Sequence, residues 1–418
     1  MEEIKEISYG GKMNALCYEN PYLREFDAKI ARIKKEGNNF LISLDKTYFF
    51  YGSGGQSCDA GEIIGGNGKA IVDEVFEADG EIIHKARITG NLYEGENVRC
   101  KIDWERRYKL MKAHTTEHLL FQCLKRKFGK IYVEKIRISP EKFSFFISFD
   151  KVDWDKILEA EKLANDIIRE GKDVLVKEID INEARSYGDN LRIKFDRIGS
   201  DRIRVVEIKD FDLAACTGLH IKNTKEIEFV LIDKITSEKG LYEVEFLIGR
   251  EAVEKALELS KIALSLSSIL QTDFSTIEKF AEKLRKDYLE LQKKFQEISK
   301  KSLEEIKYEE IAGIKLYKQV FEKIDNKTLM EKVGKIIKES KTVVIFANLN
   351  EKASIILARS DDLKLNVRDL LNEALRLMNG RGGGRENFAT GAGDKEKVDE
   401  AMDFLDRSIK NWIKGIKI

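Results

Sequence analysis

The sequence predicts an α+β protein made of four regions in chain order. Three observations predict it: strand-like runs broken by glycines at the start, a middle region in which strands and helices alternate, and a later region that is helical throughout. We expect a small β-barrel over 1–95, an α+β domain over 96–250, a helical or coiled-coil linker over 251–308 and a small α/β domain over 309–418.

The composition indicates a large protein with no net charge. The 418 residues include 74 Lys and Arg and 74 Asp and Glu, so the formal net charge is zero although 35% of the residues are charged. Because the whole molecule provides no long-range attraction for a polyanion, a nucleic-acid partner has to meet a local basic face.

The cysteines and the apolar runs indicate the compartment. Five scattered cysteines form no paired framework, which argues against a secreted disulfide scaffold. The segment Met1–Lys5 has no apolar signal region, and no apolar run reaches the ~18 residues of a membrane helix. We therefore expect a cytoplasmic protein without a membrane segment.

The first region contains runs that are rich in apolar and β-branched residues, such as 39–44 and 47–51, followed by closely spaced glycines. Strands and turns at this spacing predict a small antiparallel barrel. Within the glycines, Gly54 and Gly55 precede Gln56, whose amide offers both donors and an acceptor to a ligand. A simple turn explains the same residues equally well.

The second region begins with a predicted helix over 103–129, which Asp103 caps and Gly129 ends. His114 and His118 are four residues apart and project from consecutive turns of one helix face, so both can reach one ion. Two further elements are expected downstream, a strand over 143–149 and a helix near 153–171.

Cys216 and His220 repeat the four-residue spacing in a loop between predicted strands at 202–208 and 226–232. Three histidines and one cysteine are a ligand set that zinc accepts. The two clusters use three of the four histidines of the chain, and we predict one metal site formed by two distant segments. A hydrogen-bonded pair of core histidines with an unrelated buried cysteine is the alternative.

The third region is predicted to be helical. Ser275 to Glu278 match the capping box that opens a helix. Apolar residues then recur every seven positions, at Ile277, Leu284, Leu291 and Ile298. This repeat predicts a short coiled coil or a helical hairpin, with an ordinary amphipathic helix as the alternative.

The fourth region contains predicted strands at 342–347 and 353–358, a helix capped by Asn366, a segment rich in glycine and arginine at 379–393, and a terminal helix. Strands mixed with helices indicate a small α/β unit.

The glycine-arginine segment has two interpretations. Gly383 and Gly384 allow close approach of the backbone to phosphates, which Arg381 and Arg385 can clamp. A flexible surface loop between two helices is the alternative.

These motifs resemble those of one family. The segment 106–120 resembles the histidine motif of the alanyl-tRNA synthetase editing domain, 216–220 its cysteine–histidine partner, and 47–56 the barrel motif that precedes them. The segment 20–26 is similar to the start of the free-standing editing proteins called AlaX, and 380–393 to a domain that these synthetases share with DHH-type phosphoesterases. Together the matches follow the chain in order and indicate the long form of AlaX-type proteins.

The resemblance implies trans-editing, which is hydrolysis of the ester that joins serine, or glycine as a second candidate, to alanine tRNA, without aminoacylation. It also implies a homodimer through the C-terminal domain, and tRNA contacts by Arg381, Gly383, Gly384 and Arg385. Zinc would be held by His114, His118, Cys216 and His220.

The resemblance further places Gln56 near the substrate, while Thr47 would recognise the serine hydroxyl unless it is satisfied locally in a strand. Glu117 is a candidate general base beside His118, or it faces solvent.

The sequence departs from the family at two positions. The cysteine motif has Thr217 and Leu219 where synthetases usually carry Cys-Gly-Gly-Thr-His, and Gly52 stands where an acidic residue is common. Neither change removes a metal ligand, but the fine selectivity stays open. The sequence contains neither a Gly-x-x-x-x-Gly-Lys loop nor an Asp-His-His triplet, which argues against nucleotide hydrolysis and phosphoesterase activity.

The mechanism and two rival functions also stay open. Four protein ligands close a zinc shell, so either one ligand is loose or the metal orients the substrate more than it activates water. One rival is a noncatalytic tRNA-binding or assembly protein with structural zinc. The other is an editing hydrolase for a different substrate, such as seryl-tRNA(Thr).

Overall fold

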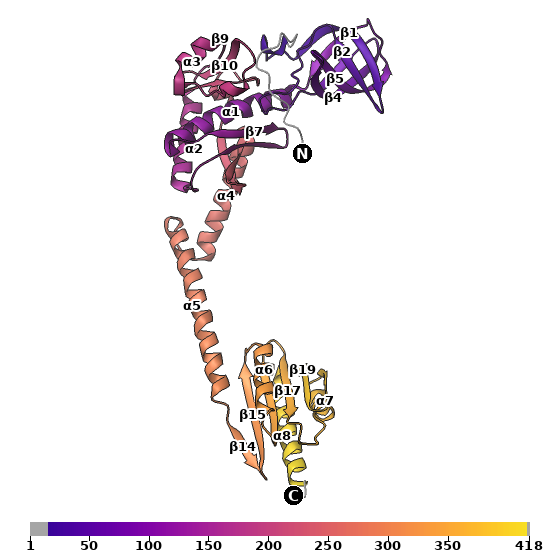
Figure 1. The fold of residues 1–418 in the computed structure, drawn as a ribbon, viewed down its shortest axis with the longest axis vertical. Coiled ribbons are helices and arrows are strands. Elements are labelled where there is room, and N and C mark those ends of the chain that lie inside the picture. Colours follow the sequence, from indigo (N-terminus) through magenta and orange to yellow (C-terminus); the bar gives the residue numbers. More distant parts are fainter. Residues whose placement is uncertain (1–15, 416–418) are drawn as a thin grey trace. The chain divides into compact units, whose positions relative to one another are not determined.

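The computed structural model describes residues 16–415 (Figure 1). The chain divides into two compact units, Met1–Leu266 and Ser267–Ile418. The first 15 residues of the expected barrel domain and the last three of the expected C-terminal domain lie outside the described residues. Among the helices that are described, none is long and apolar enough to cross a membrane.

The predicted N-terminal barrel is confirmed. Six antiparallel strands close into a barrel in the order β1-β2-β5-β4-β3-β6, and β1 pairs with β6 to complete it. In β6, buried and exposed residues alternate, with Val98, Cys100 and Ile102 pointing inward. The strands are β1 Glu25–Glu36, β2 Asn39–Leu44, β3 Gly61–Ile64, β4 Asn67–Ala78, β5 Glu81–Asn91 and β6 Asn97–Ile102.

The expected strand at 47–51 is wrong. Phe49 and Phe50 are both fully buried, which breaks the alternation of a strand. The Phe50 N–H donates to Asp59 Oδ2 at 2.6 Å, and the Asp59 N–H donates to the Phe50 carbonyl at 2.9 Å. These two bonds close the base of a loop that contains Gln56.

The predicted helix over 103–129 is confirmed as α1 Trp104–Phe128. The Asp103 side chain accepts from the Arg106 N–H, and the Gly129 N–H ends the helix by donating to the Lys125 carbonyl. The expected strand and helix downstream are present as β8 and α2, and α1 packs against α2. A four-stranded sheet in the order β12-β13-β8-β7 also contacts α1. These elements are β7 Val133–Ser139, β8 Lys142–Ile147, α2 Trp154–Glu170, β12 Val230–Glu238 and β13 Leu241–Ile248.

A three-stranded sheet in the order β11-β10-β9 carries the loop with the second pair of predicted ligands, and Cys216 directly follows β11. The predicted strand at 202–208 is confirmed as β10. The predicted strand at 226–232 is wrong over its first half, where a 3₁₀ helix, Thr224–Ile227, precedes β12. A capping box between Asn223 and Glu226 stabilises this turn. The remaining elements are β9 Val174–Asp180, β10 Arg202–Ile208, β11 Asp212–Ala215 and the short helix α3 Ile181–Ser186.

The predicted helical region consists of α4 Gly249–Ile269 and α5 Ile277–Glu304. The expected capping box at Ser275 does not form, because a 3₁₀ turn over Phe274–Thr276 precedes α5. Three heptad residues of α5 are strongly exposed in the structure, Leu284 at 51%, Leu291 at 66% and Ile298 at 64%. The coiled coil is therefore not confirmed and stays a prediction.

The predicted C-terminal α/β region is confirmed as a six-stranded sheet with helices. The strand order is β14-β15-β16-β17-β19-β18, in which β15 and β16 are parallel. Asn366 caps α7 as expected, by accepting from the Asp369 N–H. The elements are β14 Tyr308–Ile311, β15 Ile314–Glu322, α6 Asn326–Ile336, β16 Thr342–Leu349, β17 Ala353–Arg359, α7 Val367–Leu377, β18 Arg381–Gly384, β19 Phe388–Gly393 and α8 Val398–Gly415.

The glycine-arginine segment forms a hairpin of β18 and β19 at the edge of this sheet, rather than a flexible loop between helices. Gly382 pairs with Gly391 across the hairpin, and a Cβ added to either residue would meet Leu375 Cδ1 at 2.5 Å or less. The glycines therefore allow the hairpin to lie directly on α7.

Candidate metal centre

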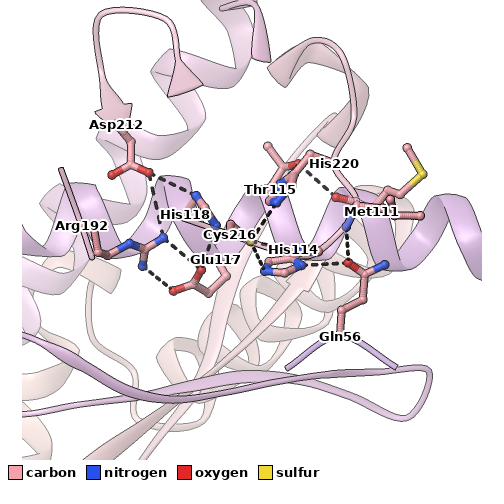
Figure 2. Close-up of polar contacts among 12 residues, drawn as sticks. Gln56, Met111, His114, Thr115, Glu117, His118, Arg192, Asp212, Cys216 and His220 are labelled. Atoms are coloured by element: carbon pink, nitrogen blue, oxygen red, sulfur yellow. Dashed lines mark hydrogen bonds and ion pairs between the residues drawn. The ribbon is translucent and has the colours of Figure 1, made fainter. Parts of the chain in front are cut away.

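The four predicted ligands meet in one place. His114 and His118 come from α1, and Cys216 and His220 from the loop after β11 (Figure 2). Their potential ligand atoms all lie within 4.8 Å of one another, and all four side chains are buried. The alternative of a histidine pair unrelated to the cysteine is therefore wrong, and the cluster can hold one metal ion.

Each histidine ring is oriented by a hydrogen bond from its Nδ1 atom to an oxygen outside the cluster. The pairs are His114 with Gln56 Oε1 at 2.8 Å, His118 with Asp212 Oδ2 at 3.2 Å, and His220 with Thr115 Oγ1 at 3.1 Å. Because Nδ1 is used in this way, Nε2 is left for the metal in all three rings.

The spacing of the ligand atoms fits zinc. Cys216 Sγ lies 3.4 Å from His114 Nε2 and 3.3 Å from His220 Nε2. These separations match the edge of a zinc tetrahedron, which is about 3.5 Å between sulfur and nitrogen for normal bond lengths. The donor set and these two separations are therefore compatible with a zinc ion.

Burial keeps the histidines in the neutral form that binds metals. Burial, with Arg192 and Arg204 nearby, lowers the pKa of His114 to about 3. The same cause holds the pKa of His118 and of His220 well below the usual value. Burial raises the pKa of the Cys216 thiol while Arg204 opposes this, and a bound dication would favour the thiolate further.

Gly218 lets the loop reach the histidine ring. A Cβ at this position would lie 2.1 Å from His114 Cε1 and 2.9 Å from Gln56 Oε1. A side chain at position 218 would collide with the ring and the glutamine. Only glycine therefore fits at this position of the loop.

Gln56 connects the barrel to the cluster. Its Oε1 accepts from His114 Nδ1 and from the Leu219 N–H at 3.0 Å, so it orients one ligand and the loop that carries two others. The side chain is 4% exposed, and its Nε2 has no hydrogen-bond partner. Gln56 therefore keeps a spare donor next to the metal ligands.

A buried ion pair fixes this loop relative to α1. The fully buried Arg107 guanidinium donates to the Asp59 carboxylate, to the Pro21 carbonyl at 2.9 Å and to the Tyr48 carbonyl at 2.7 Å. Arg107 lies seven residues before His114 on the same helix. The base of the Gln56 loop is thus attached to the helix that carries the first two ligands.

Glu117 does not face solvent, so that alternative is wrong. It is fully buried and accepts from Arg192 Nη1 at 2.9 Å, while its Oε2 lies 3.8 Å from His118 Nε2. Burial raises the pKa of Glu117, and Arg192 opposes the rise. The carboxylate therefore lies against the metal ligands with its orientation fixed.

Arg192 and Asp212 were not predicted from the sequence. They lie 75 and 94 residues from their partners Glu117 and His118, and neither belongs to a motif. A lone buried arginine or aspartate gives no signal by itself, because only the fold shows which ligand it supports.

Thr47 lies in the barrel region of the first unit. Its hydroxyl is 2.9 Å from Nε2 of the buried His84 and accepts from the Phe49 N–H at 3.1 Å. Burial lowers the pKa of His84 to about 4, so this ring is neutral and can accept the Thr47 proton. Neither bond reaches the metal cluster, and recognition of a serine hydroxyl by Thr47 stays a prediction.

The predicted tRNA-binding residues lie in the second unit. Arg381, Gly383 and Gly384 belong to β18, and Arg385 follows it directly. All four are exposed, so the hairpin presents two arginines at a sheet edge.

Models of known domains match three segments. The model described as tRNA synthetases class II (A) matches residues 8–106, the threonyl and alanyl tRNA synthetase second additional domain matches 203–242, and the DHHA1 domain matches 313–411. The second segment contains Cys216 and His220, and the third contains the glycine-arginine hairpin.

Curated relatives match across the chain. The alanyl-tRNA editing protein AlaX-L of Pyrococcus horikoshii is 29% identical over 93% of this chain and 97% of its own length. The alanine–tRNA ligases of Methanococcus vannielii and Pseudothermotoga lettingae are 29% and 28% identical over 93% and 91% of this chain. This chain spans only 43% and 46% of those two ligases.

Among solved structures, the C-Ala domain of Aquifex aeolicus alanyl-tRNA synthetase aligns at 25% identity over 25% of this chain and 99% of its own, with a TM-score of 0.24. The relatives and domain models confirm the expected resemblance to AlaX-type alanyl-tRNA editing proteins and to alanyl-tRNA synthetases.

Proposed function

We propose that this protein hydrolyses the ester that joins a wrong amino acid, serine or glycine, to alanine tRNA, and that it does so in the cytoplasm without charging tRNA itself. The observation that supports this most is the arrangement of the three histidines. Their Nδ1 atoms are all held by outside oxygens, while Nε2 of His114 and of His220 lies within 3.4 Å of the Cys216 thiol.

The metal in this proposal is zinc, held by His114, His118, Cys216 and His220. The neutral imidazoles, the thiol and the two sulfur–nitrogen separations favour zinc over harder cations. When bound, zinc would supply a Lewis acid beside the ester and a fixed point for orienting the substrate.

The protein side chains would supply the rest of the chemistry. An aminoacyl ester is already activated, so a positioned water and a polarised carbonyl are sufficient. We assign the unpartnered Gln56 Nε2 as a donor to the substrate, and the Glu117 carboxylate, held by Arg192, as the group that accepts a proton from the attacking water. Thr47 remains a candidate for hydroxyl recognition, although its hydroxyl already has two partners.

The partner in this proposal is mischarged alanine tRNA. The exposed hairpin residues Arg381, Gly383, Gly384 and Arg385 would contact its phosphates, because arginine forks match phosphate oxygens and glycines let the backbone approach. We also propose a homodimer through the C-terminal unit.

A deacylation assay tests the proposal. The protein is incubated with alanine tRNA charged with serine, glycine or alanine, and with threonine tRNA charged with serine, each with and without a zinc chelator. We expect rapid loss of serine or glycine from alanine tRNA, with alanine spared, and no turnover after chelation. An intact seryl ester on alanine tRNA in the presence of zinc-loaded protein would contradict the proposal.

The role of Glu117 has its own test. Glu117→Gln keeps an acceptor for Arg192 but removes the base, so the rate should fall by about 100-fold or more while zinc content is unchanged. Glu105→Gln, in the exposed first turn of the same helix, should keep the full rate. Equal rates for the two variants would contradict the role of Glu117 as the proton acceptor.

A second candidate is a noncatalytic tRNA-binding protein with structural zinc. The complete burial of four protein ligands favours it, because such a closed shell is typical of structural sites. If Cys216→Ala unfolds the protein, and the zinc-loaded wild type binds tRNA but cleaves none of the esters, this candidate replaces the hydrolase.

A further inference from the structure

Thr217 is the accessible residue of the metal-binding loop. Of the five residues from Cys216 to His220, it is the only one that is not buried. It also stands at a position where the synthetase motif usually has glycine, so its side chain is an addition to the loop. An accessible polar side chain between two buried ligands is placed to meet a substrate.

The Thr217 hydroxyl ends a chain of four hydroxyl groups. Thr217 Oγ1 lies 2.6 Å from Ser53 Oγ, and Ser53 is hydrogen-bonded to Tyr51. Tyr51 lies 3.3 Å from the Tyr18 hydroxyl, which donates to the Thr217 carbonyl at 2.8 Å. The chain therefore begins and ends on the same residue.

The Thr217 oxygen keeps a lone pair whichever way these hydrogen bonds run. Tyr18 gives its one proton to the Thr217 carbonyl, so Tyr51 donates to Tyr18 across the 3.3 Å contact. Between Ser53 and Thr217 either hydroxyl can be the donor. A hydroxyl oxygen has two lone pairs, so in both cases the Thr217 oxygen can accept one further hydrogen bond.

This oxygen lies beside the metal ligands. A Cβ built on Gly54 would be 3.2 Å from Thr217 Oγ1 and 3.4 Å from His114 Cε1. The hydroxyl and the ligand ring thus border the same glycine. A group bound next to the ring can reach the oxygen from the accessible side of the loop.

We propose that Thr217 determines specificity, because its oxygen accepts a hydrogen bond from the side-chain hydroxyl of a seryl ester. This inference rests on the proposed hydrolase function and names a residue that recognises the side chain of the substrate. Glycine and alanine lack this hydroxyl, so their esters would form one hydrogen bond fewer with the site. A hydrogen bond from the α-ammonium group of the substrate to this oxygen would not give specificity, because serine, glycine and alanine all carry that group.

A pair of variants tests the inference. Thr217→Val keeps the shape and removes the acceptor, whereas Thr217→Ser keeps the acceptor. Rates are measured with seryl- and glycyl-tRNA(Ala), and affinities with the inert amides 3′-serylamino- and 3′-glycylamino-adenosine. We expect Thr217→Val to lower kcat/KM and affinity for the seryl compounds by about 10-fold or more, and those for the glycyl compounds by less than about 3-fold. Thr217→Ser should stay near the wild type on both.

Zinc content and the melting temperature, measured for each variant, confirm that the site is intact. An active wild type whose ratio of seryl to glycyl rates is unchanged in Thr217→Val overturns the inference and leaves the hydrolase proposal standing. Equal losses on both substrates also overturn it, since they indicate an ammonium or structural contact. A zinc-loaded wild type that cleaves neither ester overturns the hydrolase proposal and this inference together.

Discussion

The metal centre and the glycine-arginine hairpin were both predicted from short motifs, yet their environments are opposite. The four metal ligands are buried, and each histidine ring is oriented by a hydrogen bond at its Nδ1 atom. The residues Arg381 to Arg385 are all exposed on an edge strand. A site for chemistry on one small group needs fixed atoms, whereas a surface for a large polyanion needs accessible charge.

This difference predicts which properties a substitution at each site should change. In the metal centre, removing one atom leaves a buried partner without its hydrogen bond, so effects should be large and should spread to metal affinity and folding. On the hairpin, a lost arginine is replaced by water, so effects should be confined to binding and should depend on salt.

The largest expected effect is loss of the metal. His118→Ala removes one ligand, and the deacylation rate should fall by about 1,000-fold because the Lewis acid is lost with the ion. Arg385→Ala on the hairpin is the control, which should keep its zinc and most of its rate at saturating tRNA. Metal analysis and single-turnover rates measure both variants. An active His118→Ala protein without zinc would contradict the expected dependence of the rate on the metal.

The next effect contrasts a buried and an exposed ion pair within the first unit. Arg107→Met leaves Asp59 buried without its partner and should cost about 3–5 kcal/mol of the free energy of unfolding. Arg87→Met removes a pair with Asp73 whose side chains are 64% and 50% exposed, and should cost at most about 1 kcal/mol. Urea unfolding measures the two changes. Equal costs would show that burial does not decide the effect.

A smaller effect concerns the orientation of one ligand. Gln56→Leu removes the acceptor for His114 Nδ1 and should lower zinc affinity by about 10- to 100-fold. Gln122→Leu is the control, because this amide lies on the same helix as His114 but donates to the Phe211 carbonyl. Competition with a chelator measures both affinities. Unchanged affinity in Gln56→Leu would mean that the ring holds its orientation without the glutamine.

The smallest effect belongs to the hairpin. Arg381→Gln and Arg385→Gln should each weaken tRNA binding by a few-fold and reduce the slope of log affinity against log salt by nearly one. Arg407→Gln, on the exposed side of α8, should change neither quantity. Binding measured at several salt concentrations gives the slopes. Slopes that match the wild type would show that the hairpin does not contact tRNA phosphates.

The elements predicted correctly are those that local sequence determines. The helix α1 follows from the Asp103 cap, the Gly129 end and the spacing of His114 and His118, all within one segment. The barrel follows from alternating strands and glycine turns. Local signals failed where tertiary contacts override them, as at Phe49 and Phe50. Both side chains are buried, and the Phe50 backbone N–H is hydrogen-bonded to the Asp59 carboxylate.

The metal ligands were predictable and their supports were not. A pair of ligands four residues apart has a signature in the sequence, whereas Asp212 and Arg192 lie far along the chain from the side chains they orient. Thr115 is adjacent to His114 but orients His220 on the other segment. Only the fold shows which distant oxygen faces which ring.

The burial of all four ligands also has a consequence for how the protein acquires its ion. Rings that are already turned toward a common point need little rearrangement when an ion arrives, and all four ligand residues are buried. We therefore expect the ion to enter and leave through a transient local opening of the loop after β11. The rate of that opening, rather than the affinity alone, would then set how fast the ion exchanges.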